Sequence, residues 1–183
     1  MNVLMVASGP SAGLINKLNL KNYTVVAINN GWRATEEWNY WVKALDYKGQ
    51  KPVIIPPQEI IKNYVDSLNK FGGIRNCGFS ITLAASYWVL DVLKPINMFY
   101  LGCDMNYTPD SEGKTHIYGI GSDIQKNGIS DPDKMVEDYS NGNENYLHDI
   151  YMRFNNIALK NGTNVYNLSN DPNTRLPFKR CII

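Results

Sequence analysis

The sequence predicts an α/β fold in which a mostly parallel sheet is covered by helices on both faces. Short apolar and β-branched runs alternate along the chain with longer segments that are apolar at helical spacing, and this alternation is typical of a parallel sheet. The chain has 183 residues, 44% hydrophobic and 19% charged, which suffices for a substantial core. We therefore expect a single α/β domain over residues 1–183.

Six apolar and β-branched runs predict the strands. The first run ends at Gly9-Pro10 and the second at Asn29-Asn30-Gly31, and these residue types favour turns. We expect strands at residues 3–8, 24–28, 40–45, 52–55, 97–101 and 163–168, with the last of these as the final strand of the sheet.

Three segments predict the helices that cover the sheet. Residues 58–70 are apolar at helical spacing and stop at Gly72-Gly73. Residues 81–93 are the most apolar stretch and precede Pro95, so we expect a buried helix there. A third, amphipathic helix ends at Asn161-Gly162, and its apolar stripe is expected to contain Leu147, Ile150, Tyr151, Phe154, Ile157 and Ala158.

A long polar segment precedes the third expected helix and the strand at 163–168. Residues 105–143 are rich in Gly, Asp, Ser and Pro, with at most a short helix near 134–139. A loop of this length in a compact domain is commonly a functional lid or a disordered segment. We expect a loop or lid over about 105–143.

Three polar turns are expected to meet at the carboxyl edge of the sheet, where α/β folds bind their ligands. The turn Ser8-Gly9-Pro10-Ser11 leads into a helix, and backbone N–H groups at a helix start favour an anion. Asn29-Asn30 follows the second strand, and Gly102-Cys103-Asp104 follows the strand at 97–101. This convergence predicts a Rossmann-like nucleotide-binding domain with a phosphate on the first turn. The alternative is that the turn only connects a strand to a helix.

Motifs and charge argue against several other functions. Gly9 and Gly13 are spaced G-x-x-x-G, so the dinucleotide fingerprint G-x-G-x-x-G is missing, as is the Gly-Lys-Ser/Thr of a P-loop. Eighteen Lys and Arg against 17 Asp and Glu give a net charge of +1 without a basic block, so nothing favours a nucleic-acid partner. Asp131-Pro132-Asp133 could hold a divalent metal, but a helix cap with Pro near the first turn explains it better. We expect no metal.

Cysteine usage and hydropathy favour the cytoplasm. Cys77, Cys103 and Cys181 form no C-x-x-C pair, which argues against a disulfide framework or a zinc site. We expect neither a signal peptide nor a membrane span, and no membrane partner. The sequence leaves open whether the protein forms a homo-oligomer.

Few residues could carry acid–base or phosphate chemistry. His116 lies in the polar loop after the strand at 97–101, so we favour it as the general base. His148 flanks the apolar stripe of the last helix, and we expect it to pack. Tyr107 and Tyr118 could donate hydrogen bonds to a leaving phosphate, and Arg75 could bind a phosphate or a carboxylate.

Several short motifs together resemble a known family. The strings "ASGPS" after the first strand, "AINNG" after the second and "FYLGCDMNY" after the buried helix precede a loop of His, Tyr, Gly and Ser. This order is similar to that of the small bacterial sialyltransferases that use CMP-sialic acid. It also resembles the related Rossmann-like group of archaeal-type hydroxymethylpterin pyrophosphokinases and flagellin-glycosylation accessory factors. The resemblance spans most of the chain.

The resemblance implies roles for individual residues. It implies that Tyr107 and Tyr118 stabilise the departing phosphate and that a histidine before the last helix is the base. The family string Tyr-Ile-Gly-His-Ser reads Tyr118-Gly-Ile-Gly-Ser122 here, so the nearest histidine is His116. The residues implied to hold the nucleotide are Gly9, Pro10, Ser11 and Asn29 or Asn30.

One function and two alternatives follow. We expect a glycosyltransferase-like enzyme that binds a nucleotide-activated sugar, with a CMP-sugar favoured, and transfers the sugar to an acceptor hydroxyl without metal or further cofactor. The alternatives are a pterin-type pyrophosphokinase that uses ATP and magnesium, with Asp104, Asp110 and Glu112 as its acids, and a nucleotide-binding module without turnover. The full set of expected nucleotide-binding residues is Ser8, Gly9, Pro10, Ser11, Asn29, Asn30, Ser80, Gly102 and Asp104.

Overall fold

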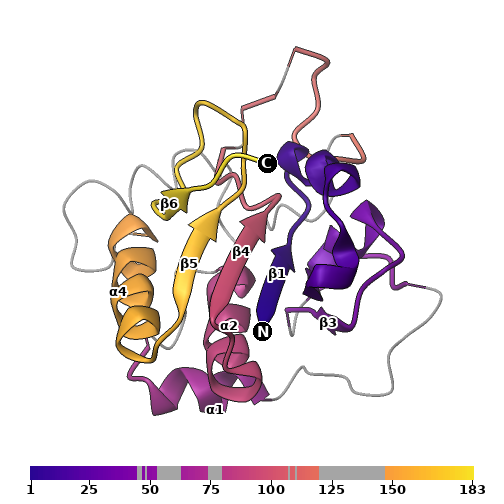
Figure 1. Ribbon diagram of the computed structural model, residues 1–183. Coiled ribbons are helices and arrows are strands. Elements are labelled where there is room, and N and C mark those ends of the chain that lie inside the picture. The colour runs from indigo at the N-terminus through magenta and orange to yellow at the C-terminus, as the bar shows by residue number, and fades with distance from the viewer. Residues whose placement is uncertain are drawn as a thin grey trace.

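The computed structural model describes residues 1–44, 47, 49–52, 63–73, 80–106, 108–109, 111–119 and 147–183. These residues form a six-stranded, all-parallel sheet with helices packed against it (Figure 1). None of the described helices is long and apolar enough to cross a membrane. The predicted α/β class is confirmed.

The order of the strands is β3-β2-β1-β4-β5-β6. The chain builds outward from β1 to β3, returns to place β4 beside β1, and then builds outward in the other direction. This is the strand order of a Rossmann-like domain, and its switch point lies between β1 and β4. The strands are β1 (Asn2–Val6), β2 (Thr24–Ile28), β3 (Tyr40–Val42), β4 (Asn97–Leu101), β5 (Asn164–Asn167) and β6 (Lys179–Arg180).

Five of the expected strands are confirmed, three of them with slightly different bounds. Most of the expected strand at 52–55 lies outside the described residues. The expectation that 163–168 forms the final strand is wrong, because β6 pairs with β5 at the edge of the sheet. Both residues of β6 are exposed and cationic, so no apolar pattern marks this strand in the sequence.

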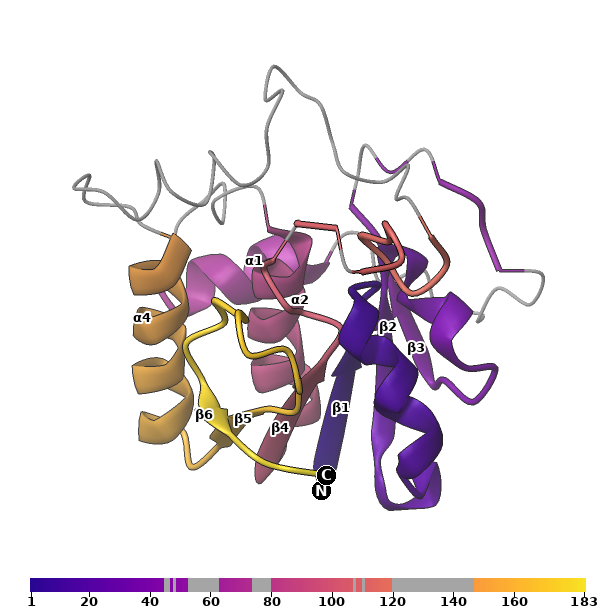
Figure 2. The ribbon, with the colours of Figure 1, turned by 90° about the horizontal axis from the view of Figure 1, so that it is seen from above.

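Three α-helices of the described part of the chain cover one face of the sheet, as seen from above in Figure 2: α1 (Asn63–Lys70), α2 (Ile81–Trp88) and α4 (Leu147–Lys160). A π-helical turn, η5 (Val89–Leu93), extends α2 up to Lys94, whose φ of 48° places it in the left-handed region. The helices expected from apolar spacing are thus confirmed, apart from residues 58–62, which lie outside the described part.

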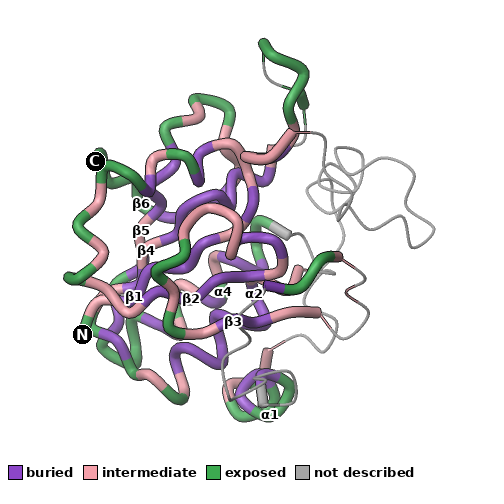
Figure 3. The backbone as a smooth tube through the Cα atoms, turned by 90° about the vertical axis from the view of Figure 1, so that its right-hand side faces the viewer, coloured by how far each residue is buried: buried purple, intermediate pink, exposed green. Residues whose placement is uncertain are grey.

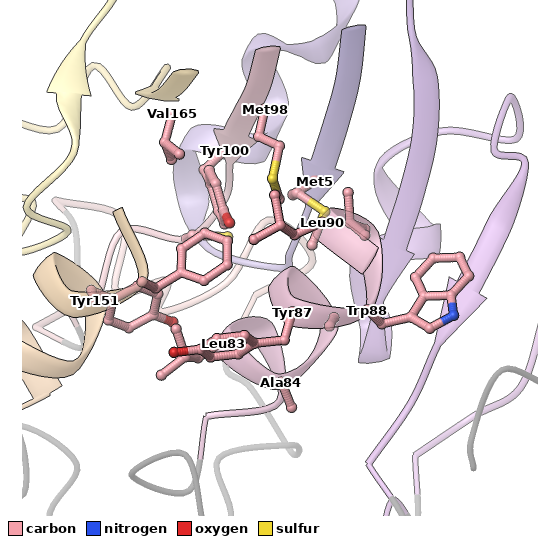
Figure 4. Packing of buried hydrophobic residues seen from close by; sticks show 14 of the residues in the cluster. Met5, Leu83, Ala84, Tyr87, Trp88, Leu90, Met98, Tyr100, Tyr151 and Val165 are labelled. Atoms are coloured by element: carbon pink, nitrogen blue, oxygen red, sulfur yellow. The ribbon is translucent and has the colours of Figure 1, made fainter. Parts of the chain in front are cut away.

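The larger part of the core lies between this face and the helices. Figure 4 shows Met5 and Met98, which project from the sheet, close to Leu90 of η5. Tyr100 of β4 is fully buried, and its hydroxyl donates a 2.5 Å hydrogen bond to Ser86 Oγ in α2. Sheet and helices are therefore joined by apolar contact and by a satisfied internal hydrogen bond.

The opposite face is covered by 3-10 helices: η1 (Pro10–Lys17), η2 (Leu20–Asn22) and η3 (Asn29–Ala34). They pack on a smaller core that includes Leu4 and Val6 of β1 and Ile15 of η1. The strands are mostly buried, whereas the loops around them are largely half-buried or exposed (Figure 3). Both faces carry helices, as predicted, but within the described residues only one face carries α-helices.

Candidate functional site

The turns after β1 and β4 touch backbone to backbone at the carboxyl edge of the sheet, toward which the arrowheads point in Figure 1. Ala7 N–H donates to Leu101 O at 2.9 Å, and Gly9 N–H donates to Gly102 O at 2.8 Å. Gly102 has a φ of 71°, and a Cβ on it would lie 2.4 Å from Ala7 O. Only glycine fits this position. The expected meeting of these turns at one edge is confirmed.

A buried carboxylate lies at the centre of this contact. Asp104 is 2% exposed, and its Oδ2 accepts a 3.0 Å hydrogen bond from Ser11 N–H. Its Oδ1 accepts the hydroxyl proton of Ser169, and the Ser11 hydroxyl oxygen accepts Gly102 N–H at 3.0 Å. We call Ser11, Gly102, Asp104 and Ser169 the Asp104 cluster. It joins the β1 turn, the β4 turn and the segment after β5.

This geometry corrects the expectation of an open phosphate seat at the first turn. The N–H groups of Gly9 and Ser11 both have acceptors within the protein, and Pro10 has no N–H. The anion at the start of η1 is the Asp104 carboxylate, which a helix N-terminus stabilises as it would a phosphate. A Cβ on Gly9 would lie 2.5 Å from Asp104 Oδ2, so glycine is needed here for internal packing. Nucleotide binding by residues 8–11 stays a prediction, and a phosphate on these amides would have to displace Asp104.

The two asparagines after β2 bind neighbouring loops. Asn29 has a φ of 47°, and its Oδ1 accepts Ala44 N–H at 3.0 Å. Asn30 is fully buried: its Oδ1 accepts the Tyr47 hydroxyl, and its Nδ2 donates to the Tyr118 hydroxyl at 3.2 Å. Asn30 therefore joins the end of β2 to two loops that are distant in sequence.

His116 reaches this edge, as expected, but it is buried there. Ile117 N–H donates to Ser8 O at 2.9 Å, which fixes residues 115–119 against the β1 turn. The His116 side chain stacks on Tyr118 with 5.3 Å between ring centroids, and its Nδ1 lies 2.9 Å from Thr115 Oγ1. At 6% exposure, the His116 side chain is enclosed by the protein.

Trp32 and Arg33 join this group from η3, and the sequence reasoning missed both. The Arg33 guanidinium carbon lies 4.4 Å from the Tyr118 ring centroid and 5.5 Å from that of Trp32. Its Nη2 donates to Gln50 Oε1 at 2.7 Å. We call Trp32, Arg33, Gln50 and Tyr118 the Arg33 cluster. The sequence signal for these two residues was their position directly after the turn Asn29-Asn30-Gly31. The sequence-based prediction used the turn but not the two residues that follow it.

The second histidine does not pack, contrary to expectation. The His148 side chain is 55% exposed, with Nδ1 3.3 Å from Asp149 Oδ1. On an α-helix, position 148 lies about 120° from the centre of the stripe that Ile150, Phe154 and Ala158 bury. That angle is enough to turn the ring into solvent.

The remaining candidates have other contacts within the protein or lie outside the described residues. The Ser80 hydroxyl caps α2 by accepting Leu83 N–H at 3.4 Å and lies 2.7 Å from the Tyr151 hydroxyl. Cys103 is buried, which raises the pKa of its thiol, and Cys181 is exposed. Tyr107, Arg75, Cys77, Asp110 and Asp131-Pro132-Asp133 all fall outside the part of the chain that is described.

A metal site is not apparent among the described residues. No group of three or more His, Cys, Asp or Glu within them could hold an ion. Asp104 is engaged by Ser11 and Ser169, and Glu112 forms an ion pair with Lys114. Two of the three acids proposed for a magnesium-dependent enzyme thus have partners in the protein.

Comparison of the chain with protein-family models, with curated proteins and with solved structures finds no match. The strand order therefore defines the fold, and the contacts at the carboxyl edge define the candidate site. The resemblance to sialyltransferases stays a prediction from the ordered short motifs of the sequence.

Proposed function

We propose that this protein binds a nucleotide-activated sugar at the carboxyl edge of its sheet and transfers the sugar to an acceptor hydroxyl without a metal. The observation that carries the proposal is the convergence of four segments at the switch point: residues 8–11, 29–33, 102–104 and 115–119. Parallel α/β sheets bind nucleotides at such a point. The resemblance to the sialyltransferases favours a CMP-sugar as the donor.

The proposed reaction is a displacement at the anomeric carbon of the sugar. The acceptor oxygen forms the new bond to that carbon and gives its proton to the His116 ring. The bond from the anomeric carbon to the phosphate oxygen breaks, and the nucleotide leaves with the electron pair. Hydrogen bonds from Tyr118 and Tyr107 would stabilise the charge that develops on the phosphate.

The stacking of His116 and Tyr118 supports these paired roles. A base and an electrostatic stabiliser must act on atoms of one substrate, and the two rings are 5.3 Å apart. Thr115 bonds Nδ1 and so orients the ring. The remaining nitrogen, Nε2, is the one we assign to the acceptor proton.

One observation favours a second candidate, a nucleotide-binding module without turnover. At 6% exposure, His116 meets an acceptor only if the loop around it shifts. The pyrophosphokinase alternative is less favoured, because two of its proposed acids, Asp104 and Glu112, already have partners in the protein.

The test is a comparison of nucleotide binding and donor consumption in matched histidine variants. Calorimetry with CMP, UMP, AMP and GMP identifies the base, and release of nucleotide from the sugar donor measures turnover, with and without EDTA. We expect His116→Gln to keep CMP binding and to lose turnover by about 100-fold or more, because removing a general base has that effect. The exposed His148, changed to Gln, serves as the control and should keep full turnover.

Other outcomes assign other functions. Binding without any donor consumption would establish the module. Complete loss of activity in EDTA, restored by magnesium, would point to the pyrophosphokinase. Absence of binding to every nucleotide would refute the proposed function altogether.

A further inference from the structure

Arg33 and Trp32 are held at the carboxyl edge by tight backbone packing. They lie in η3, directly after Gly31, and a Cβ on Gly31 would lie 2.0 Å from Val6 O and 3.1 Å from Ala7 Cα. The backbone of η3 is thus in direct contact with the end of β1. This packing fixes the backbone from which both side chains project.

The Arg33 side chain is also fixed before any ligand binds. Its guanidinium lies over the Tyr118 ring, and its Nη2 is bound to Gln50. Tyr118 is itself bound to the fully buried Asn30. A preorganised guanidinium loses little freedom on binding an anion.

The charge of Arg33 is not neutralised by the described residues. Among the ion pairs that they form, none includes Arg33. The neighbours that hold it are the neutral groups of Tyr118, Trp32 and Gln50. Among the described residues, this corner of the edge therefore carries a net positive charge.

Two N–H donors of this pair are buried without an acceptor in the described part of the chain: Arg33 Nε and Trp32 Nε1. Folded proteins rarely leave a buried donor unsatisfied, and each exception calls for a water, an ion or a ligand. Here both exceptions belong to adjacent residues whose side chains are in contact, beside an unneutralised cation.

We propose that Arg33 and Trp32 bind the phosphate of the nucleotide donor, an inference that rests on the proposed function. Phosphate oxygens accept from both an arginine N–H and an indole N–H, and the guanidinium supplies the opposite charge. The other anion seat at this edge, the start of η1, holds Asp104. The donor phosphate thus lies on the β2 side of the switch point, within reach of Tyr118.

The test follows the indole N–H of Trp32 by NMR. The chain has four tryptophans, and Trp32→Phe identifies the signal of Trp32 while keeping an aromatic ring beside Arg33. We titrate the wild-type protein with CMP, cytidine and inorganic phosphate. We expect CMP and phosphate to shift the Trp32 signal and cytidine to leave it in place. The Trp41 indole, which already donates to Asn29 O at 2.8 Å, is the internal reference.

Affinity measurements in variants give a second, independent readout. We expect Arg33→Gln to weaken CMP binding by about tenfold or more and to leave cytidine binding unchanged, because only CMP carries the phosphate. Trp32→Phe should weaken CMP binding in the same direction by a smaller factor. Arg153→Gln is the control, since Arg153 lies in α4 and its exposed side chain donates a hydrogen bond to Gly72 O.

The outcomes separate this inference from the proposed function. The inference is overturned, and nucleotide binding stands, if CMP binds normally to Arg33→Gln and Trp32→Phe and leaves the Trp32 signal of the wild-type protein unmoved. If phosphate shifts the Trp32 signal but no nucleotide binds more tightly than phosphate, the anion site stands and the proposed function fails. If no anion moves the signal, the inference is overturned.

Discussion

Two polar clusters lie at the same edge of the sheet, and they differ in how fully their hydrogen bonds are satisfied. In the Asp104 cluster, both carboxylate oxygens accept hydrogen bonds, and Ser11 N–H and Gly102 N–H have acceptors. In the Arg33 cluster, two buried donors have no acceptor among the described residues. The first cluster contains its own anion, and the second contains a cation.

This difference separates a structural contact from a candidate binding site. A satisfied buried network gains nothing from a ligand and rigidifies the fold. An unsatisfied donor carries a desolvation penalty of about 1–3 kcal/mol that an incoming acceptor would remove. We therefore assign the Asp104 cluster to stability and the Arg33 cluster to binding, and each prediction below tests one side of that assignment.

The largest effect is expected where η3 packs on β1. A Cβ on Gly31 would overlap Val6 O at 2.0 Å, and the atoms that it meets are backbone atoms of Val6 and Ala7, which cannot move aside as a flexible side chain could. We expect Gly31→Ala to lower the free energy of unfolding by about 3 kcal/mol or more, or to prevent folding. Denaturant unfolding measures the change. Gly13→Ala is the matched control, because nothing lies within 4 Å of a Cβ there, and equal stability of the two variants would contradict the packing argument.

The next effect concerns the carboxylate of the Asp104 cluster. Asp104→Ala leaves Ser11 N–H and the Ser169 hydroxyl without an acceptor in a buried place, so we expect a loss of about 2–3 kcal/mol in the free energy of unfolding. Added formate should restore part of this loss by occupying the vacated seat. The variant should still bind CMP, since the phosphate is assigned to the Arg33 cluster.

The thiol of Cys103 reports whether the Asp104 cluster has opened. Burial raises the pKa of Cys103, so in the folded protein the thiol is both protonated and shielded from reagents. With Cys77 and Cys181 changed to Ser, alkylation at pH 8 should be slow in the parent and faster in Asp104→Ala. Equal rates would mean that Asp104 does not hold this edge together.

The fold was largely predictable from local patterns, because most of the strands are marked by their own residues. β1, β2 and β4 are apolar runs that end at Gly, Pro or Asn, and α4 has a clear stripe. β6 was not predictable, since its two residues are Lys and Arg and only its pairing with β5 defines it.

The site was predictable only in part, because its decisive contacts join distant residues. Ser8, Asn30 and Tyr118 were placed at one edge correctly, but their partners could not be inferred. Ser11 and Asp104 are 93 positions apart, so the sequence could not show that a carboxylate would occupy the amides of the first turn. A glycine-containing turn looks the same whether its N–H groups face a ligand or the protein.

The smallest effect is expected for a carboxylate on the surface, which calibrates the loss assigned to Asp104. Asp91 in η5 accepts hydrogen bonds from Lys70 Nζ at 2.5 Å and from Ser67 Oγ at 3.1 Å. The bond from Lys70 holds the pKa of Asp91 below its ordinary value. A carboxylate whose pKa is lower in the folded state adds stability at neutral pH and loses it as the pH falls through that lowered pKa.

Because the Lys70 side chain is 61% exposed, we expect Asp91→Asn to cost less than about 1 kcal/mol at pH 7. The difference in melting temperature from wild type should shrink as the pH is lowered below about 4. Lys70→Gln should reproduce the loss, and the double variant should be no less stable than either single one if the two residues act as a pair. A loss at pH 7 as large as that of Asp104→Ala would show that burial and full hydrogen bonding do not set the Asp104 cluster apart.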